Sequence, residues 1–197
     1  MSYESESNDI LIACTGESLI TRSLSKFREE RFLRMVQMLR DADVAFTNAE
    51  CLFQNYEDHP NTVAGGGAAT GTYLASHPRN IKELQWAGID VVACANNHGS
   101  DYGEGGFSLS TIANRDDVEA NLKWVRDARR MADWVLVSFH NHGASPSPDE
   151  PSEHAKLLAR ACIEAGADVF IGHGPHRDRG IEIYQGKPIW KRRLSRG

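Results

Sequence analysis

Five short apolar segments recur along this chain, and each is followed by polar residues or glycine before a helical pattern begins. They are DILIACT (9–15), VAFTNA (44–49), IDVVACA (89–95), WVLVSFH (134–140) and ADVFIG (167–172). Continuous β-rich runs of this length are typical of strands buried on both faces of a mainly parallel sheet. Their alternation with helices predicts an α/β fold, a layered sandwich of helices against a parallel or mixed sheet.

The intervening segments carry helical signals. Phe32, Met35, Val36 and Leu39 follow the spacing of one helix face, and residues 158–165 repeat this stripe. Residues 81–87 predict a short helix that ends at Gly88, and residues 116–133 open with acidic and close with basic side chains, as the helix dipole favours. The segment GIEIYQGKPIW (180–190) predicts a hairpin around residues 185–187.

One glycine-rich stretch, TVAGGGAATGT (62–72), interrupts this pattern. It lacks the Gly-Lys-Ser/Thr ending of a phosphate-binding loop, which disfavours a nucleotide-binding α/β protein. We therefore interpret it as a flexible surface loop.

Size and charge narrow the classes of function. The 197 residues predict one domain, 1–197, and the net charge of −5 without a long basic block argues against a nucleic-acid partner. The four cysteines are far apart in sequence, so we expect buried thiols rather than a zinc knuckle or a disulfide framework. The sequence as given shows no secretory signal and no apolar run long enough for a membrane span, which predicts a cytoplasmic protein unless a leader has been removed.

Polar side chains follow each of the five predicted strands. In chain order they are Glu17; Asn48 and Glu50; Asn96, Asn97 and His98; His140 and His142; and His173 and His176. The carboxyl ends of strands in an open α/β sheet share one edge, so we expect these residues to converge in a single crevice. An isolated histidine or asparagine at a strand end is usually a turn former, but five such ends in succession favour a shared site.

Carboxylate, amide and imidazole groups together form a ligand set suited to Mn²⁺, Fe²⁺ or Zn²⁺. Two such ions bridged by a carboxylate activate water and stabilise an oxyanion, which indicates hydrolysis as the reaction class. His140 and His142 alternate along a strand and are expected to point to opposite faces unless the strand has ended. We therefore expect at most one of them to be a ligand, and favour His142.

The run GIDVVACANNHGSDYGEGG, with NAE upstream and VSFHNHG and AGADVFIGHGPHRDRGIEIYQGKPI downstream, resembles the bacterial capsule synthesis protein CapA family, also called the poly-γ-glutamate synthesis or PgsA-like family. The resemblance extends from about residue 10 to 190. ANNHxxDYGxxG and GHGPH together are specific to it. These proteins are related in fold to calcineurin-like metallophosphoesterases, so the resemblance implies a metallophosphoesterase-like fold and a metal-dependent hydrolase.

The resemblance also implies roles for individual residues. His98 is expected to assist the leaving group or the oxyanion, and Asp101 to orient His98. The implied metal ligands are Glu17, Glu50, Asn97, His142, His173 and His176, with Glu50 as the bridging carboxylate. We expect Asn48, Asn96 and His140 to contact the substrate, either a small molecule or an anionic polymer such as poly-γ-glutamate, at a phosphoester or amide bond.

The chain departs from the family pattern in three ways. Glu17 stands where the family usually has aspartate, the segment between the ANNH motif and the fourth strand is short, and the C-terminus diverges after GKPI. A chain that lacks sheet strands has exposed edges, so a homo-oligomer is a further expectation. The alternative function is a non-catalytic scaffold or polymer-binding protein that retains the fold, which Glu17 and the shortened middle favour.

Overall fold

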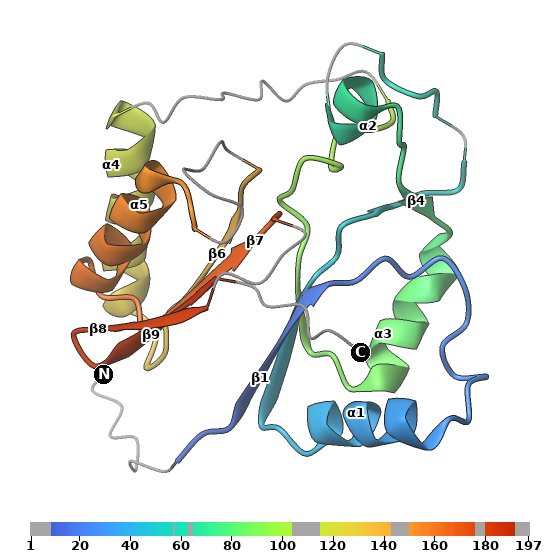
Figure 1. Cartoon of the computed structure of the whole chain (residues 1–197), viewed down its shortest axis with the longest axis horizontal. Coiled ribbons are helices and arrows are strands. Elements are labelled where there is room, and N and C mark those ends of the chain that lie inside the picture. The colour runs from blue at the N-terminus through green and yellow to red at the C-terminus, as the bar shows by residue number, and fades with distance from the viewer. Residues whose placement is uncertain are drawn as a thin grey trace. The chain divides into compact units, whose positions relative to one another are not determined.

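The computed structural model describes residues 9–56, 58–62, 65–103, 115–142, 150–175 and 180–191. The chain divides into two compact units (Figure 1). Unit 1 consists of Met1–His59 and Leu74–Cys94, and unit 2 of Pro60–Tyr73 and Ala95–Gly197.

Unit 1 is built on a three-stranded parallel sheet with the strand order β1-β2-β5. Its elements are β1 (Ile12–Glu17), α1 (Glu30–Arg40), β2 (Val44–Asn48), β3 (Leu52–Phe53), β4 (Ala75–Ser76), the 3-10 helix η1 (Pro78–Asn80), α3 (Ile81–Ala87) and β5 (Val91–Ala93). Helix α1 packs against β2 and α3, and the core contains Leu39, Ala45, Leu84 and Ile89. Helix α3 ends at Gly88, which has a φ of 92°, as the sequence predicts.

Unit 2 contains a four-stranded sheet with the order β6-β7-β9-β8, in which only the β8–β9 pair is antiparallel. Its elements are α2 (Gly65–Thr70), α4 (Arg115–Arg129), β6 (Leu136–His140), α5 (Glu153–Glu164), β7 (Val169–His173), β8 (Ile181–Tyr184) and β9 (Lys187–Lys191). Helix α5 packs on β7 and β9, and α4 packs on α5. The predicted hairpin is confirmed, with Gln185 and Gly186 at φ 50° and 77°, both positive as in a type I′ turn.

The α/β class and all five predicted strands are confirmed, but two expectations about the sheet are wrong. The first three strands lie in the sheet of unit 1 and the last two in the sheet of unit 2, so the five do not share one sheet edge. Burial on both faces also fails for β5, whose Val91 and Val92 are 49% and 43% exposed. In the described part of the chain β5 lies at one edge of its sheet, with β2 as its paired neighbour.

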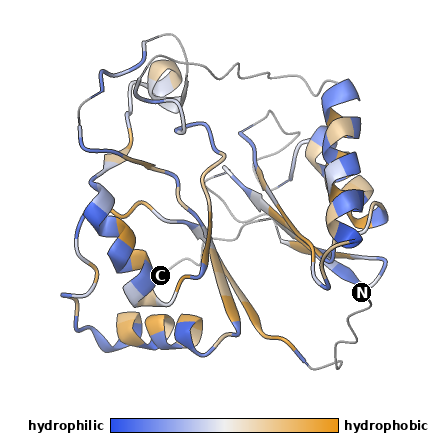
Figure 2. Cartoon of the chain, turned by 180° about the vertical axis from the view of Figure 1, so that it is seen from behind, coloured by the Kyte–Doolittle hydropathy of each residue, from blue (hydrophilic) through white to orange (hydrophobic). Residues whose placement is uncertain are grey.

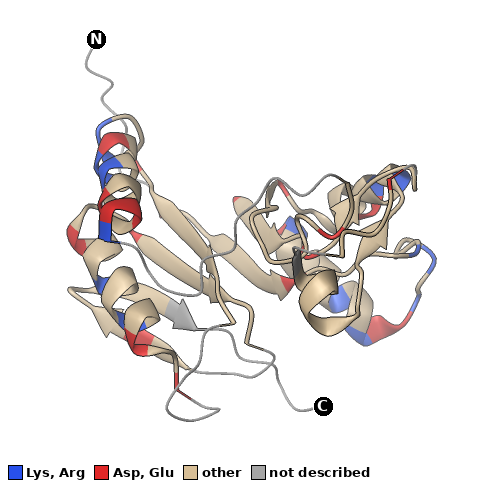
Figure 3. Cartoon of the chain, turned by 90° about the horizontal axis from the view of Figure 1, so that it is seen from above, with Lys and Arg blue, Asp and Glu red and all other residues tan. Residues whose placement is uncertain are grey.

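The helices separate polar from apolar side chains (Figure 2). Figure 3 shows most of the charged residues on helices and loops, whereas the strands are largely uncharged. Helix α4 begins with Asp116 and Asp117 and ends with Arg126 and Arg129, as its charge pattern predicts. Among the described residues, no helix combines the length and apolar character needed to cross a membrane.

Candidate functional site

The Asn96-Asn97-His98 segment forms a tight turn in unit 2. The Asn96 side-chain oxygen Oδ1 accepts a hydrogen bond from the backbone N–H of His98 (3.0 Å), and the Asn96 carbonyl accepts one from Gly99 (3.1 Å). Asparagine stabilises such a turn because its side chain reaches its own backbone two residues on. The turn thereby presents Asn97 and His98 from a rigid backbone.

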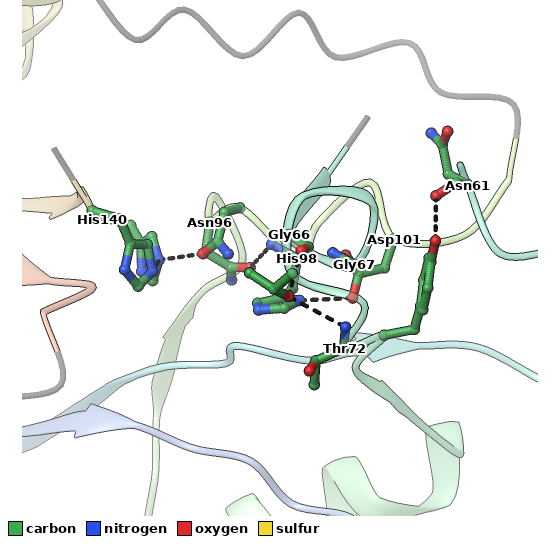
Figure 4. A network of polar contacts seen from close by, with 12 residues as sticks. Asn61, Gly66, Gly67, Thr72, Asn96, His98, Asp101 and His140 are labelled. Atoms are coloured by element: carbon green, nitrogen blue, oxygen red, sulfur yellow. Dashed lines mark hydrogen bonds and ion pairs between the residues drawn. The ribbon is translucent and has the colours of Figure 1, made fainter. Parts of the chain in front are cut away.

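His98 and Asp101 form a buried pair within this turn (Figure 4). His98 Nδ1 lies 2.7 Å from Asp101 Oδ2, and the other carboxylate oxygen accepts a hydrogen bond from the backbone N–H of Gly67 (2.7 Å). Asp101 is fully buried. The carboxylate fixes the tautomer with hydrogen on Nδ1, which leaves Nε2 as the ring nitrogen for chemistry. The contact expected between His98 and Asp101 is present, and their catalytic roles stay a prediction.

The glycine-rich stretch is not the surface loop that its composition predicts. Residues Gly65–Thr70 form helix α2, and Gly66 and Gly67 are buried. A Cβ atom added at Gly66 would lie 2.6 Å from His98 Cε1, and one at Gly67 would lie 2.6 Å from Cε1 of the Tyr73 ring. Glycine suits these positions because the helix backbone closely approaches the Asn96-Asn97-His98 turn, and the Gly66 N–H also donates to the Asn97 carbonyl (2.5 Å).

His140 and His142 converge with Asn97. His140 Nε2 lies 2.5 Å from Asn97 Oδ1 and 3.0 Å from His142 Nε2, and the two imidazole rings meet edge to face at a centroid distance of 4.9 Å. The expectation that the two rings point to opposite faces is wrong, because residues two apart along an extended chain point to the same side, and the two imidazole rings lie together here. The geometrical reason for admitting only one of them as a ligand therefore does not hold.

The donor set of this cluster fits a divalent cation. Two imidazole nitrogens and an amide oxygen suit Mn²⁺, Fe²⁺ or Zn²⁺. Two nitrogens bound at right angles with bonds of about 2.1 Å would be about 3.0 Å apart, close to the separation of the two Nε2 atoms. A neutral imidazole carries at most one hydrogen on Nε2, and that hydrogen cannot point at both neighbours. One cation would accept an electron pair from each of the three atoms at once.

His173 ends strand β7 directly beside His140, since the two residues are paired in the parallel register. It is only 2% exposed, and its carbonyl accepts a hydrogen bond from the N–H of Asn141 (3.0 Å). His176 lies outside the described residues, so its predicted role as a ligand stays a prediction.

In unit 1, the polar strand ends lie at the carboxyl edge of β1 and β2. Glu17 pairs with Asn48 across a one-residue irregularity in β1, between Cys14 and Glu17. Such a bulge changes the direction of the side chains that follow it. Asn48 is fully buried and Glu50 is 3% exposed.

A cluster of hydroxyl groups holds this edge together. Thr47 Oγ1 lies 2.6 Å from both Thr15 Oγ1 and Ser18 Oγ, and it donates to the Gly16 carbonyl (3.0 Å). These contacts use the one hydrogen and the two acceptor positions that a threonine hydroxyl offers. Thr47 therefore holds Gly16 and Ser18, the residues on either side of Glu17.

The cysteines follow the expectation of buried thiols only in part. All four are free, but Cys94 is exposed and Cys14 is half-buried. Burial is the main cause that raises the pKa of the Cys51 thiol, and the neighbouring Cys94 and Glu50 raise it further. Burial also raises the pKa of Cys162 to about 11.

Sequence reasoning missed the residues that support the predicted ones. The GGG motif was the available signal for Gly66 and Gly67, since glycine is the residue used where a backbone must approach its neighbours closely. Asn141, which lies between the two histidines, and its partners Ser152 and His154 gave no periodic or motif signal.

Comparison with known proteins identifies the family. The model of the bacterial capsule synthesis protein PGA_cap matches residues 11–116 and 108–190. The chain belongs to this family. The resemblance drawn from the ANNHxxDYGxxG and GHGPH motifs is thus confirmed, and the α/β fold described above is that of a capsule synthesis family member.

Several curated relatives match in sequence. The PGA biosynthesis protein CapA of Bacillus subtilis is 24% identical over 247 aligned positions, which include 93% of this chain and 62% of that protein. The uncharacterized protein y4sH of Sinorhizobium fredii is 42% identical over 78 residues, 40% of this chain and 17% of that protein. A probable polyglutamine synthesis accessory protein of Mycobacterium tuberculosis is 39% identical over 77 residues, 38% of this chain and 18% of that protein.

The chain spans less than two thirds of the length of each of these relatives. The alignment with the Bacillus subtilis protein has more positions than this chain has residues. That relative therefore carries internal residues that this chain lacks, which confirms that the chain is internally shortened.

Proposed function

We propose that this protein is a metal-dependent hydrolase of the capsule synthesis family that acts on an anionic polymer of the poly-γ-glutamate type. The observation that carries the proposal is the convergence of Asn97 Oδ1 and His142 Nε2 on His140 Nε2, at 2.5 and 3.0 Å. A buried imidazole–carboxylate pair, His98 and Asp101, lies in the same turn as Asn97. A ligand cluster beside an oriented histidine is the arrangement that metal-assisted hydrolysis needs.

In this proposal Asn97, His140 and His142 hold a divalent ion of the Mn, Fe or Zn type. By resemblance to the family, Glu17, Glu50, His173 and His176 complete a centre for two ions, with Glu50 as the bridge. Such ions supply Lewis acidity and activate water at neutral pH. We thus propose that His140 is a metal ligand and not the substrate contact expected from the sequence.

The remaining residues position the substrate and move a proton. Asp101 holds the His98 ring through Nδ1, so a proton carried on Nε2 is the one that His98 transfers to the leaving oxygen or nitrogen. Gly67 keeps the Asp101 carboxylate in place by its N–H. Asn48 and Asn96 are proposed to contact the polar groups of the substrate.

The names of the relatives support the polymer but leave the bond open. The Bacillus subtilis protein is named for PGA biosynthesis and the Mycobacterium tuberculosis protein for polyglutamine synthesis. A phosphoester and an amide both develop an oxyanion that this set of groups would stabilise. We therefore propose hydrolysis at one of these two bonds.

The test is metal content and turnover of the full chain. The purified protein, loaded with Mn²⁺ or Zn²⁺, is expected to retain about two ions per chain and to hydrolyse a generic phosphodiester or poly-γ-glutamate. His140→Ala should lose bound metal, because it removes the atom on which the other two converge. His98→Ala should keep the metal but lose turnover by about 10²–10⁴-fold, the usual contribution of a general acid.

A matched control is His59→Ala, since His59 is an exposed histidine of unit 1 outside the proposed site. It should retain both metal and activity. A wild-type protein without stoichiometric metal and without turnover on either substrate class would contradict the proposal.

That outcome would favour a second function, a non-catalytic scaffold or polymer-binding protein. The internal shortening and Glu17 in place of the usual aspartate favour it, because the atoms that bind a metal ion must lie within about 0.5 Å of their productive positions. Binding of poly-γ-glutamate without metal would identify this function.

A further inference from the structure

Asn141 lies between the two histidines of the cluster and is held from several sides. It directly follows β6, and its backbone N–H donates to the carbonyl of His173 (3.0 Å). Gly174, with a φ of 105°, comes so close that an added Cβ would lie 2.6 Å from the Asn141 carbonyl oxygen. The backbone that carries His140 and His142 is therefore fixed at its central residue.

The Asn141 side chain reaches the start of helix α5. Its Nδ2 group lies 3.1 Å from Ser152 Oγ and 2.9 Å from His154 Nε2. An amide nitrogen has two hydrogens and no acceptor capacity, so both contacts are donated by Asn141. His154 then accepts through Nε2, which sets its tautomer with the hydrogen on Nδ1.

Ser152 is used in an unusual way for its position. It is the N-cap residue of α5 and is 1% exposed, yet its side chain makes no capping hydrogen bond. An N-cap serine normally stabilises its helix by about 1 kcal/mol through such a bond. Here the hydroxyl instead contacts Asn141, and His154 Nε2 lies 3.4 Å away. The Ser152 hydroxyl at the start of α5 thus stabilises Asn141, between His140 and His142, and does not cap its own helix.

We propose that His154 is a positioning residue that, through Asn141, holds His140 and His142 in the geometry that binds a metal ion. The inference deepens the proposed function and rests on it. His154 contacts neither of the two histidines directly; it accepts a hydrogen bond from the residue between them. The bond fixes the rotation of Asn141 and thereby the chain direction after β6, where the two imidazole nitrogens come within 3.0 Å.

The test is Co²⁺ binding to the full chain, followed by visible absorption. His154→Leu removes the acceptor at similar volume and should weaken Co²⁺ binding by about tenfold, the lower end of the effect of outer-shell partners on metal affinity. His154→Gln places an amide oxygen near the position of Nε2. It should restore the affinity to within about threefold of the wild type and recover the wild-type Co²⁺ spectrum.

Cys162→Ala is the matched control for stability, because Cys162 is a buried core residue of the same helix and lies outside the cluster. It should lower the melting temperature without weakening Co²⁺ binding. The inference is overturned if His154→Leu binds Co²⁺ as tightly as the wild type, or if Cys162→Ala weakens binding to the same extent. If the wild type binds no Co²⁺, the proposed function and this inference both fail. If the wild type binds Co²⁺ and His154→Leu binds it equally tightly, only this inference fails.

Discussion

The polar residues of unit 1 and those of unit 2 are held in place by different means. In unit 1, the Thr47 hydroxyl joins β1 to β2 through contacts that follow from the pairing of neighbouring strands. In unit 2, the supporting groups come from outside the sheet: Gly67 of α2 for Asp101, and Ser152 and His154 of α5 for Asn141. The positions of the carboxylates in unit 1 thus depend on paired strands. The positions of the histidines in unit 2 depend on loops and on residues at the starts of helices.

This difference has a physical consequence. Strand pairing satisfies many backbone groups at once, so the loss of one side-chain contact is distributed over the ladder. A loop that is fixed by one or two close approaches has no such reserve. A substitution at Gly174, whose neighbours are backbone atoms of Asn141, should therefore cost more than the loss of a hydroxyl in unit 1.

The largest effect is expected for Gly174→Ala. Its φ of 105° is strained for any other residue, and the new Cβ would lie within 3.0 Å of three backbone atoms of Asn141, which cannot rotate away. Backbone strain and overpacking together should destabilise unit 2 by about 3 kcal/mol or more. Urea denaturation, with hydrogen exchange of the β6 and β7 amides to locate the loss, measures it.

Gly180→Ala is the control for Gly174→Ala. Gly180 also has a positive φ, 81°, but an added Cβ would have no atom within 4 Å. It should therefore cost only the strain of the left-handed conformation, about 1–2 kcal/mol. Equal losses in the two variants would show that the approach to Asn141 contributes nothing.

The test in unit 1 is Thr47→Val. The substitution keeps the shape but removes the hydroxyl that bonds Thr15, Ser18 and the Gly16 carbonyl in a fully buried position. Buried polar groups that lose a partner cost about 1–3 kcal/mol, so the free energy of unfolding should fall by about 2 kcal/mol. Thr21→Val, at an exposed threonine, should change it by less than about 0.5 kcal/mol. If Thr47→Val lowers the free energy of unfolding more than Gly174→Ala does, the strand contacts of unit 1 and not the loop contacts of unit 2 are the more sensitive.

The strands and the paired residues of the site could be predicted from the sequence, because both follow from local patterns. Apolar runs predict the strands, and the i, i+3 spacing of His98 and Asp101 brings them together within one turn. The division into two sheets could not be predicted, since each apolar run is compatible with either sheet. The bulge before Glu17 also has no sequence signal.

Helix α2 shows why composition alone misleads. Three glycines in succession cost roughly 1 kcal/mol each in a helix, so propensity predicts a loop. Tertiary contact overrides this preference, because the Gly66 backbone lies against the side chains of Asn97 and His98, which a larger residue would displace. The same applies to Asn141, whose partners Ser152 and His154 are set by the docking of α5 and not by any spacing in the sequence.

Gly66→Ala should have the smallest effect on stability and separates positioning from folding. The new methyl would meet side-chain atoms of Asn97 and His98, which can move, and Gly66 has no strained φ. We therefore expect the free energy of unfolding to fall by about 1 kcal/mol, the lower end of the cost of overpacking, while Mn²⁺ affinity and turnover fall by about tenfold as the displaced groups lose their alignment. Gly71→Ala, at a positive φ of 75° with no atom within 4 Å of an added Cβ, should do the reverse and lower stability without affecting metal binding. A Gly66→Ala protein with unaltered metal affinity and turnover would mean that α2 supports only the fold of unit 2, and that the close approach to the Asn97-His98 turn does not serve the proposed chemistry.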